Sequence, residues 1–536
     1  MLRALTALRR SSVPGPLLAI AVSAGLYALA FPPFGHAWVA WVCLAPLIPL
    51  WERARPLPAA LLGLAHGTLI SLTTTPWLVL TLRDYFGRSG PWAALLLTAF
   101  GVATLGLYHA PAFAALAASR RRLPRGVWLA LIPAAWVVVE WARSSLGLRC
   151  PWEKLGDAFW SWPRLRELVS VTGVYGLTAL AGLANVALAE TVRAIPAGLR
   201  GRFGPARSAA TWALAFTLAL AFASGFGAVP AAQATEEPER LAGDNLLRVA
   251  IVQGNIAPRL RWQRSHASRV LRRYAGLTRR ELRAGRPPDL ILWPEQALQT
   301  SLDDPAYGPP LRAFLASLST PLLFGAPRQE GHGRARRIYN SAFLSRPGAA
   351  PLVYDKRRLV PFSETHPWGR RFGALRGDLD VAEYRPGREP GLFHWNGPTL
   401  GVLICFEAIY PEMARELARG GARVLVNLSN DGWFLGRGGQ EQHLAQVVLR
   451  AVETGLPVVR ATTTGISAVI SPDGTLRAQL GRDRQGVLQA AVAAPPRRLT
   501  PYVRLGDAFA AACTGTWLLA LCAAARRRRP SNPPSP

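Results

Sequence analysis

Cysteine is scarce in this chain of 536 residues, which has five, at positions 43, 150, 405, 513 and 522. No two of them form a C-x-x-C pair, and no group of His and Cys residues has the spacing of metal ligands. The sequence therefore predicts neither a disulfide framework nor a zinc site, and we expect no metal and no cofactor. Three of the five cysteines fall in or near long apolar stretches of the kind that cross membranes, whereas Cys405 does not.

Acidic residues are also few, with 32 Asp and Glu against 62 Lys and Arg, which gives a formal net charge of +30. Such an excess can indicate nucleic-acid binding, but the sequence contains no recognised nucleic-acid motif, so we expect no nucleic-acid partner. Half of the residues are hydrophobic. This composition is typical of a membrane protein in which many of the basic residues act as cytoplasmic anchors.

Long apolar runs fill the first part of the chain and return once near its end. We expect seven transmembrane helices in a domain at residues 1–230, and one C-terminal transmembrane helix at residues 506–526. The second and third runs are shorter than the roughly 20 residues that cross a 30 Å hydrocarbon core. The runs cover residues 15–31, 38–51, 59–72, 91–118, 126–142, 168–189, 209–228 and 508–525.

Arginine clusters predict the orientation of these helices. Under the positive-inside rule the clusters lie in the cytoplasm, so the segment between the seventh and eighth helices is expected outside it. An alternative for the first run is a cleavable signal peptide, because Ala-Leu-Ala at 28–30 resembles a cleavage site. We favour a retained helix, since its removal would reverse the sidedness of every later loop. The clusters occupy alternate connections, at residues 3–10, 53–55, 120–125, 193–207 and 526–529.

Residues 244–499 have a different composition, in which nine short β-rich runs, read as strands, alternate with three polar helical segments at 266–285, 412–421 and 441–455. This alternation predicts an α/β domain. Glu295 ends the run LILWPE, Lys356 ends LVYDK, and Cys405 follows GVLI. Because α/β folds place their chemistry at strand ends, these three side chains can form one site. Each also has a structural alternative: Cys405 as a buried core cysteine, Glu295 as a helix cap, and Lys356 as part of a solvated basic run.

The three side chains together suit nucleophilic catalysis. A thiol has an ordinary pKa of about 8.5 and needs a base to become a nucleophile at neutral pH. Glu295 can take that proton, while the cation of Lys356 favours the thiolate and stabilises the oxyanion of a tetrahedral intermediate. No histidine is required.

The sequence around these residues resembles the carbon-nitrogen hydrolase (nitrilase) superfamily, and most closely its membrane-bound branch, the apolipoprotein N-acyltransferases. The resemblance implies a four-layer αββα sandwich, with Glu295 as general base, Lys356 as the cation beside the oxyanion and Cys405 as nucleophile. It also implies a lid at residues 365–387. The blocks that carry it are QGNIAPRLRW (253–262), LILWPEQA, YNSAFL, YDKRRLVPFSE (354–364), ICFEAIYPE, NLSNDGWF (427–434) and QHLAQVVLRAVETGLPVVRATTTGISAVI.

Further residues carry over as supporting or substrate-binding groups by the same resemblance, although several have structural alternatives such as turns, caps and packing. Two short stretches, TTTG at 462–465 and DGWFL at 431–435, depart from the family's usual pattern. The supporting residues are Glu364, Glu407, Trp262, Asn340, Trp433 and Phe434.

The resemblance implies acyl transfer from a phospholipid, through a thioester on Cys405, to the N-terminal amine of a diacylglyceryl-cysteine apolipoprotein. It also implies a monomer in the bacterial inner membrane with its catalytic domain on the periplasmic side. One alternative is a membrane-tethered amidase that gives the acyl group to water, although a tether needs only one helix. Another is a non-enzymatic membrane protein that binds a ligand; ionisable residues are scarce in most spans, with His66, His109 and Glu140 as exceptions.

Overall fold

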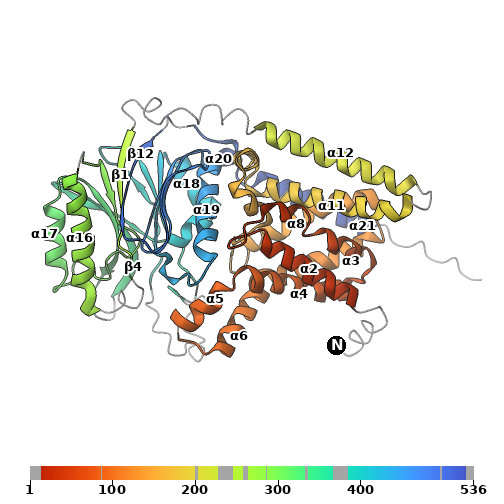
Figure 1. Ribbon diagram of the computed structural model, residues 1–536, viewed down its shortest axis with the longest axis horizontal. Helices are drawn as coiled ribbons and strands as arrows, with labels where there is room; N and C mark the ends of the chain where they lie inside the picture. The colour runs from red at the N-terminus through yellow and green to blue at the C-terminus, as the bar shows by residue number, and fades with distance from the viewer. Residues whose placement is uncertain are drawn as a thin grey trace, which may run out of the picture. The chain divides into compact units, whose positions relative to one another are not determined.

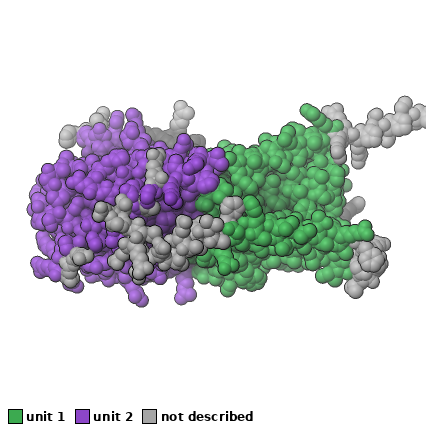
Figure 2. Space-filling view, turned by 90° about the horizontal axis from the view of Figure 1, so that it is seen from above, with its two compact units in different colours: residues 1–79, 89–226, 507–536 green, residues 80–88, 227–506 purple. Residues whose placement is uncertain are grey.

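The computed structural model describes residues 14–85, 87–198, 203–226, 246–256, 264–284, 287–331, 333, 336–361, 363–365, 384–494, 496 and 498–526. The chain divides into two compact units, which Figure 2 shows in different colours. The first unit comprises residues 1–79, 89–226 and 507–536, and the second comprises residues 80–88 and 227–506.

Long apolar helices make up the first unit, as its composition predicts. Among the described residues, six helical stretches are long and apolar enough to cross a membrane, and α2 is a shorter apolar helix. A π-helical turn, Val102–Gly106, joins α6 to α7, so that residues 90–120 form one of the six. The helices are α2 (Pro14–Leu29), α4 (Pro56–Thr74), α6 (Gly90–Gly101), α7 (Leu107–Arg120), α8 (Arg125–Ser145), α11 (Val174–Gly198), α12 (Phe203–Phe226) and α21 (Ala508–Arg526).

The second apolar run, residues 38–51, departs from a regular helix, so the expected count of eight helices is approximate. It folds as two 3-10 segments, Ala37–Trp41 and Ala45–Leu47, followed by α3 (Ile48–Arg53). Pro46 and Pro49 lie in this run, and proline lacks the N–H group that a continuous helix needs.

Asn185, a buried residue of α11, satisfies backbone groups at this break. Its side-chain oxygen accepts hydrogen bonds from the N–H groups of Leu44 at 2.6 Å and Ala45 at 2.9 Å. Its amide nitrogen donates to the carbonyl of Ala40 at 2.9 Å. Irregular backbone at membrane depth is tolerated only where protein groups or water satisfy it, so Asn185 allows the segment to remain non-helical.

A pair of glycines allows α4 to pack closely against the helices that follow it. A Cβ at Gly63 would lie 2.6 Å from the carbonyl oxygen of His109, and one at Gly67 would lie 2.7 Å from the carbonyl carbon of Leu105. Small residues four apart are the usual device for close helix contact in membranes. Short segments complete this part of the chain: α5 (Trp77–Leu80), η3 (Thr81–Tyr85), η5 (Leu155–Ser161), α9 (Pro163–Arg166) and α10 (Val169–Thr172).

The second unit contains two six-stranded sheets, with strand orders β12-β1-β2-β3-β4-β5 and β11-β10-β9-β8-β7-β6. Strands β1, β2 and β3 are parallel, as are β7, β8 and β9. The strands are β1 (Leu246–Gln253), β2 (Leu290–Leu292), β3 (Leu322–Glu330), β4 (Arg337–Arg346), β5 (Ala349–Asp355), β6 (Leu392–Phe393), β7 (Leu400–Ile404), β8 (Val424–Ser429), β9 (Val458–Thr462), β10 (Ser467–Ile470), β11 (Leu476–Leu480) and β12 (Gly486–Ala493).

The two sheets pack face to face between two layers of helices, as Figure 1 shows. In β1, Val249 and Ile251 join a core with residues of β7 and β8, whereas Ala250 and Val252 join a core with α16 and α17. This alternation follows from the two-residue period of a strand and covers both faces of the first sheet. The helices are α16 (Ala267–Ala284), α17 (Gly308–Ala316), α18 (Pro411–Arg419), α19 (Gly439–Thr454) and α20 (Pro501–Leu505).

This arrangement confirms the predicted αββα sandwich. The nine predicted strands correspond to β1–β5 and β7–β10, and the three predicted helices correspond to α16, α18 and α19. The sequence interpretation missed β6, β11, β12 and α17. Of these, β12 pairs with β1 along its whole length and so closes one edge of the first sheet.

Candidate active site

The ends of three strands bring together the three side chains that the sequence singled out. Glu295 follows β2, Lys356 follows β5 directly, and Cys405 follows β7 directly. The ammonium nitrogen of Lys356 lies 2.9 Å from Oε1 of Glu295. Cys405 is close enough to both for their charges to act on its thiol. All three residues are buried.

Two predicted supporting residues complete a ring around Lys356. Its Nζ also lies 2.9 Å from Oε1 of Glu364. Asn340, on β4, donates from Nδ2 to Oε1 of Glu295 and to Oε1 of Glu364, each at 2.8 Å. Two donors therefore bridge the same two carboxylates. The second oxygen of Glu364 accepts the N–H of Val360, and this bond fixes the chain that follows Lys356.

The charge balance of this ring favours a protonated lysine. Burial opposes the ammonium form, but Glu295 and Glu364 outweigh it and hold the pKa of Lys356 well above its ordinary value. The second oxygen of Glu295 accepts the N–H of Asn430 at 2.8 Å. Two carboxylates facing one ammonium leave an excess of negative charge in the ring.

Cys405 sits at a strained turn between β7 and a 3-10 segment, Cys405–Ile409. Its φ is +51°, a conformation that costs a residue with a side chain about 1–3 kcal/mol. Burial, and then the charge of Glu295, raise the pKa of the thiol above its ordinary value, while Lys356 acts in the opposite direction. The resting thiol therefore keeps its proton at neutral pH, and a base must remove it during reaction.

Glu407 ties the cysteine turn to the segment after Lys356. Its carboxylate accepts the N–H of Ile404 at 2.8 Å, that of Arg357 at 2.7 Å and that of Arg358 at 3.0 Å. The hydroxyl of Tyr354 donates to both oxygens, at 2.8 and 2.9 Å. Burial raises the pKa of Glu407 despite the backbone hydrogen bonds, which favour its charged form.

The other predicted residues lie in or beside the loop after β8, or outside the described residues. The rings of Trp433 and Phe434 stack with centroids 4.1 Å apart, and Phe434 packs 5.6 Å from the ring of His443. Trp262 lies outside the described residues, as do residues 366–383 of the predicted lid. At the end of that segment, the hydroxyl of Tyr384 accepts from the side chain of Gln296 at 3.0 Å.

The TTTG stretch supports the loop that contacts Glu295. The hydroxyl of Thr463 donates to Oδ1 of Asn430 at 3.0 Å, and Asn430 in turn binds Glu295. A Cβ at residue 465 would lie 2.3 Å from Oδ2 of Asp431, so only glycine fits there. Gly432, in the DGWFL stretch, donates its N–H to the same Asn430 oxygen at 3.2 Å.

Sequence reasoning missed the buried polar groups behind the nucleophile. His443, Asp431 and Arg460 are buried and bonded to one another, and His443 and Asn427 contact the carbonyl of Cys405. One signal was available, because an arginine in the apolar strand LPVVRAT needs a buried anionic or polar partner.

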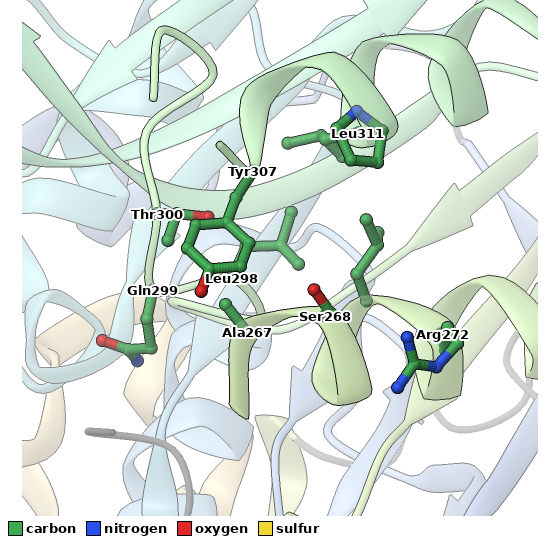
Figure 3. Close-up of a pocket in the computed structure, with 10 residues that line it drawn as sticks. Ala267, Ser268, Arg272, Leu298, Gln299, Thr300, Tyr307 and Leu311 are labelled. Atoms are coloured by element: carbon green, nitrogen blue, oxygen red, sulfur yellow. The ribbon is translucent and has the colours of Figure 1, made fainter. Parts of the chain in front are cut away.

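A pocket of about 210 Å³ lies elsewhere in this unit, between α16, α17 and residues 298–300 (Figure 3). Ser268 and Arg272 of α16 line one side, and Tyr307 and Leu311 line another. None of the predicted site residues lines this pocket. Among the described residues, no group of three or more His, Cys, Asp or Glu side chains is arranged to hold a metal ion.

Comparison with known proteins agrees with this division of the chain. A family model for the apolipoprotein N-acyltransferase N-terminal domain matches residues 23–187, and the carbon-nitrogen hydrolase model matches residues 248–502. Two solved structures are similar to part of this chain: Saccharomyces cerevisiae Nit3, a member of branch 10 of the nitrilase superfamily, and an amidase from Nesterenkonia sp. Nit3 has a TM-score of 0.37 and 18% sequence identity, and the match covers 46% of this chain and 90% of Nit3. The amidase has a TM-score of 0.37 and 22% sequence identity, and the match covers 49% of this chain and 94% of the amidase.

Relatives over nearly the whole chain carry one name. Apolipoprotein N-acyltransferase of Geobacter metallireducens is 32% identical over 513 residues, which cover 95% of each chain. The protein of that name from Caulobacter vibrioides is 32% identical and covers 94% of this chain and 93% of its own. That from Pseudomonas aeruginosa is 31% identical, with 92% and 93% covered. The chain therefore belongs to the apolipoprotein N-acyltransferase family.

Proposed function

We propose that this protein transfers an acyl chain from a membrane phospholipid to the N-terminal amine of a diacylglyceryl-cysteine apolipoprotein. Family membership supports the proposed transfer, and the arrangement of three side chains in the site supports the proposed chemistry. Lys356 binds Glu295 at 2.9 Å in a buried cluster beside Cys405, so a base, a cation and a thiol share one site.

In the first half-reaction Cys405 is the nucleophile. Glu295 takes the thiol proton as the sulfur attacks the ester carbonyl of the phospholipid, and the ammonium of Lys356 stabilises the oxyanion. The N–H of Phe406 is a second oxyanion donor, because the first N–H groups of a helix have no partner within it. The carbon–oxygen bond then breaks, and protonated Glu295 returns its proton to the departing lysophospholipid, which leaves an acyl thioester.

In the second half-reaction the acceptor amine attacks the thioester. Glu295 takes a proton from the attacking nitrogen, the carbon–sulfur bond breaks, and the same proton returns to the sulfur of Cys405. The products are an amide and the free thiol, so the enzyme is restored without any cofactor. In this scheme Glu364 and Asn340 fix the positions of Glu295 and Lys356 relative to each other. Glu407 orients the turn at Cys405 and the segment that follows Lys356.

The apolar helices suit an enzyme whose substrates are lipids. Both substrates carry long acyl chains, and drawing such a chain into water costs about 0.8 kcal/mol per CH₂ group. An enzyme that joins two lipids is therefore expected to work at the bilayer surface. We propose that the chain lies in the bacterial inner membrane as a monomer, with the catalytic unit on the periplasmic side. We also propose that Trp262, Trp433 and Phe434 bind substrate.

Intact mass spectrometry tests the proposal. After incubation of the purified protein with phospholipid vesicles, we expect one added acyl mass, mapped to Cys405 and absent from Cys405→Ala. An adduct on another of the five cysteines, or one that persists in Cys405→Ala, would contradict it. A phospholipid ether analogue, which has no ester carbonyl to attack, is the control and should leave the mass unchanged.

A further inference from the structure

Two arms of buried hydrogen bonds converge on the backbone carbonyl of Cys405. Nε2 of His443 lies 3.2 Å from this oxygen, and Nδ2 of Asn427 lies 3.3 Å from it. A carbonyl oxygen only accepts hydrogen bonds, so Nε2 of His443 must carry a proton and donate. Both arms therefore hold the peptide group that follows the reactive cysteine.

Both arms start from one arginine, Arg460, on β9. One guanidinium nitrogen donates to Oδ1 of Asn427, which fixes the amide so that its nitrogen faces Cys405. The other donates to Oδ2 of Asp431 at 2.6 Å and lies 3.2 Å from Nδ1 of His443. Oδ1 of Asp431 lies 3.1 Å from the same ring nitrogen and accepts the hydroxyl of Ser429 at 2.7 Å.

Burial and the neighbouring charges shift the pKa values of the groups in this network. Despite burial, Arg460 and His443 keep the pKa of Asp431 well below its ordinary value, so it is charged. Burial and Arg460 lower the pKa of His443. Arg460, Asp431, His443 and Asn427 are all at most 1% exposed.

The carbonyl of Cys405 sets the direction of the neighbouring N–H. A peptide group is planar, and its carbonyl and N–H point in opposite directions. Donors that hold the carbonyl oxygen on one side therefore aim the N–H of Phe406 to the other side. The left-handed φ of Cys405 makes this control necessary, because a strained turn keeps its geometry only when its surroundings fix it.

We propose that His443 and Asn427, held by Arg460 and Asp431, are positioning residues that fix the Cys405–Phe406 peptide plane for attack on an acyl carbonyl. The inference rests on the proposed role of Cys405 as nucleophile. It goes beyond that role, because it assigns the alignment of nucleophile and oxyanion donor to His443 and Asn427, which hold the carbonyl of Cys405. The network reaches the thiol through another member, Ser429, whose side chain hydrogen-bonds it. Small misplacements of such groups lower rates about a hundredfold.

A matched pair of variants tests the His443 arm. In His443→Gln the amide nitrogen reaches the place of Nε2, whereas in His443→Asn it reaches only the place of Nδ1. Asn427→Asp removes the other donor and keeps the acceptor for Arg460. Thr454→Val is the control, because it removes a buried side-chain hydrogen bond to Arg450 from the same helix, away from Cys405.

The readouts separate alignment from thiol reactivity in the full-length protein. Acylation is followed as the burst of p-nitrophenolate from p-nitrophenyl butyrate, which requires a tetrahedral intermediate. Alkylation of Cys405 by iodoacetamide, which forms no oxyanion, is measured by peptide mass mapping. Both rates are expressed per folded protein.

We expect His443→Asn and Asn427→Asp to lose about a hundredfold in acylation, and His443→Gln to stay within about tenfold of the original protein. Alkylation should change less than about threefold in both His443 variants, and Thr454→Val should match the original in both assays. Asn427→Asp adds a negative charge that also slows alkylation, so its acylation should fall at least about tenfold further than its alkylation. Equal acylation rates for His443→Gln and His443→Asn would overturn the inference, and so would acylation and alkylation rates that fall by the same factor. If neither His443 variant folds, the acylation and alkylation rates of Asn427→Asp decide whether the inference holds. If phospholipid fails to acylate the protein while the butyrate burst shows this pattern, the proposed function fails and the positioning inference stands.

Discussion

At the scale of single residues, the charge around Cys405 decides when its thiol ionises. Glu295 and Glu364 share one ammonium, Lys356, so the cluster holds more negative than positive charge. Burial raises the pKa of the Cys405 thiol, and the negative charge of Glu295 raises it further. Glu295 therefore has two opposed effects, because it suppresses the resting thiolate and yet supplies the base that creates it during reaction.

Glu295→Gln should separate these two effects. Since the pKa of Cys405 is raised in the original protein, its alkylation by iodoacetamide should keep rising with pH from 7 to 10. Removal of the Glu295 charge lowers that pKa, so the variant should be alkylated faster at pH 8. Its acylation by phospholipid should fall about 10²–10⁴-fold, because the base is gone. Alkylation that slows in the same proportion as acylation would refute this account.

Glu407→Gln tests the carboxylate that joins the two backbone segments. A Gln amide has one acceptor oxygen where Glu407 offers two, so at least one N–H of Ile404, Arg357 or Arg358 meets a donor. An unsatisfied buried group costs about 1–3 kcal/mol, so we expect both a lower melting temperature and slower acylation per folded protein.

The matched control for this variant is Glu416→Gln. Glu416 binds Arg357 at 2.7 Å and its side chain is 44% exposed. An exposed ion pair contributes at most about 1 kcal/mol to stability, so its loss should change neither the melting temperature nor the acylation rate measurably. A stable Glu407→Gln protein with normal acylation would show that the carboxylate has no such role.

What the sequence predicted at this scale depended on local motifs. Glu295, Lys356 and Cys405 each end an apolar strand, which can be read from the chain, and Asn340 and Glu364 lie in recognisable blocks. Their roles remain proposals. His443 and Arg460 were missed because their partners come from other elements of the unit, namely β8 and the 3-10 segments at Cys405 and Asp431. The distances that define a buried ion network cannot be read from neighbouring residues in the sequence.

At the scale of elements, short apolar β-rich runs predicted almost every strand of the core, because both faces of these strands are buried. Strand β12 was missed, since it is only partly buried and rich in alanine. The apolar run at 38–51 has the composition of a transmembrane helix but does not form one continuous helix. Its two prolines were the visible signal, and the group that compensates for them, Asn185, lies far away in sequence.

Asn185→Leu tests this compensation. The leucine leaves the N–H groups of Leu44 and Ala45 and the carbonyl of Ala40 without the partner they now have. At about 1–3 kcal/mol for each buried group, we expect a lower melting temperature in detergent and poorer accumulation in membranes. Thr217→Val is the control, because Thr217 bonds only within its own exposed helix turn and its replacement should be neutral. A normal melting temperature for Asn185→Leu would contradict the assignment.

At the scale of the whole molecule, the sidedness of the catalytic unit depends on how many times the chain crosses the membrane. At a helical rise of about 1.5–2.0 Å per residue, a segment as long as residues 37–53 reaches roughly 26–34 Å, so we count it as a crossing. Seven crossings then precede the catalytic unit. With the arginine clusters in the cytoplasm, this unit is predicted to lie outside.

Reporter fusions after residue 228 test that prediction. Alkaline phosphatase, which folds only outside the cytoplasm, should be active there, and β-galactosidase should be inactive. The same fusions after residue 200, in a predicted cytoplasmic connection, provide the control and should give the opposite result. Phosphatase activity at 200 together with galactosidase activity at 228 would reverse the topology.

The acceptor of the acyl group separates the proposed transferase from a membrane-tethered hydrolase, since both would form the same thioester. A transferase has to protect its thioester from water, which is present at about 55 M outside the bilayer, until the amine arrives. With phospholipid alone, we expect one lysophospholipid per Cys405, then a stall, because the acyl group stays on the sulfur. Addition of a diacylglyceryl-cysteine peptide should restart turnover and transfer the acyl group to the peptide amine, whereas a peptide with an acetylated amine should not. Lysophospholipid and free fatty acid, followed together over time, provide the measurement. Steady release of fatty acid that the peptide does not change would show a hydrolase, because water would then be the acceptor that the site accommodates.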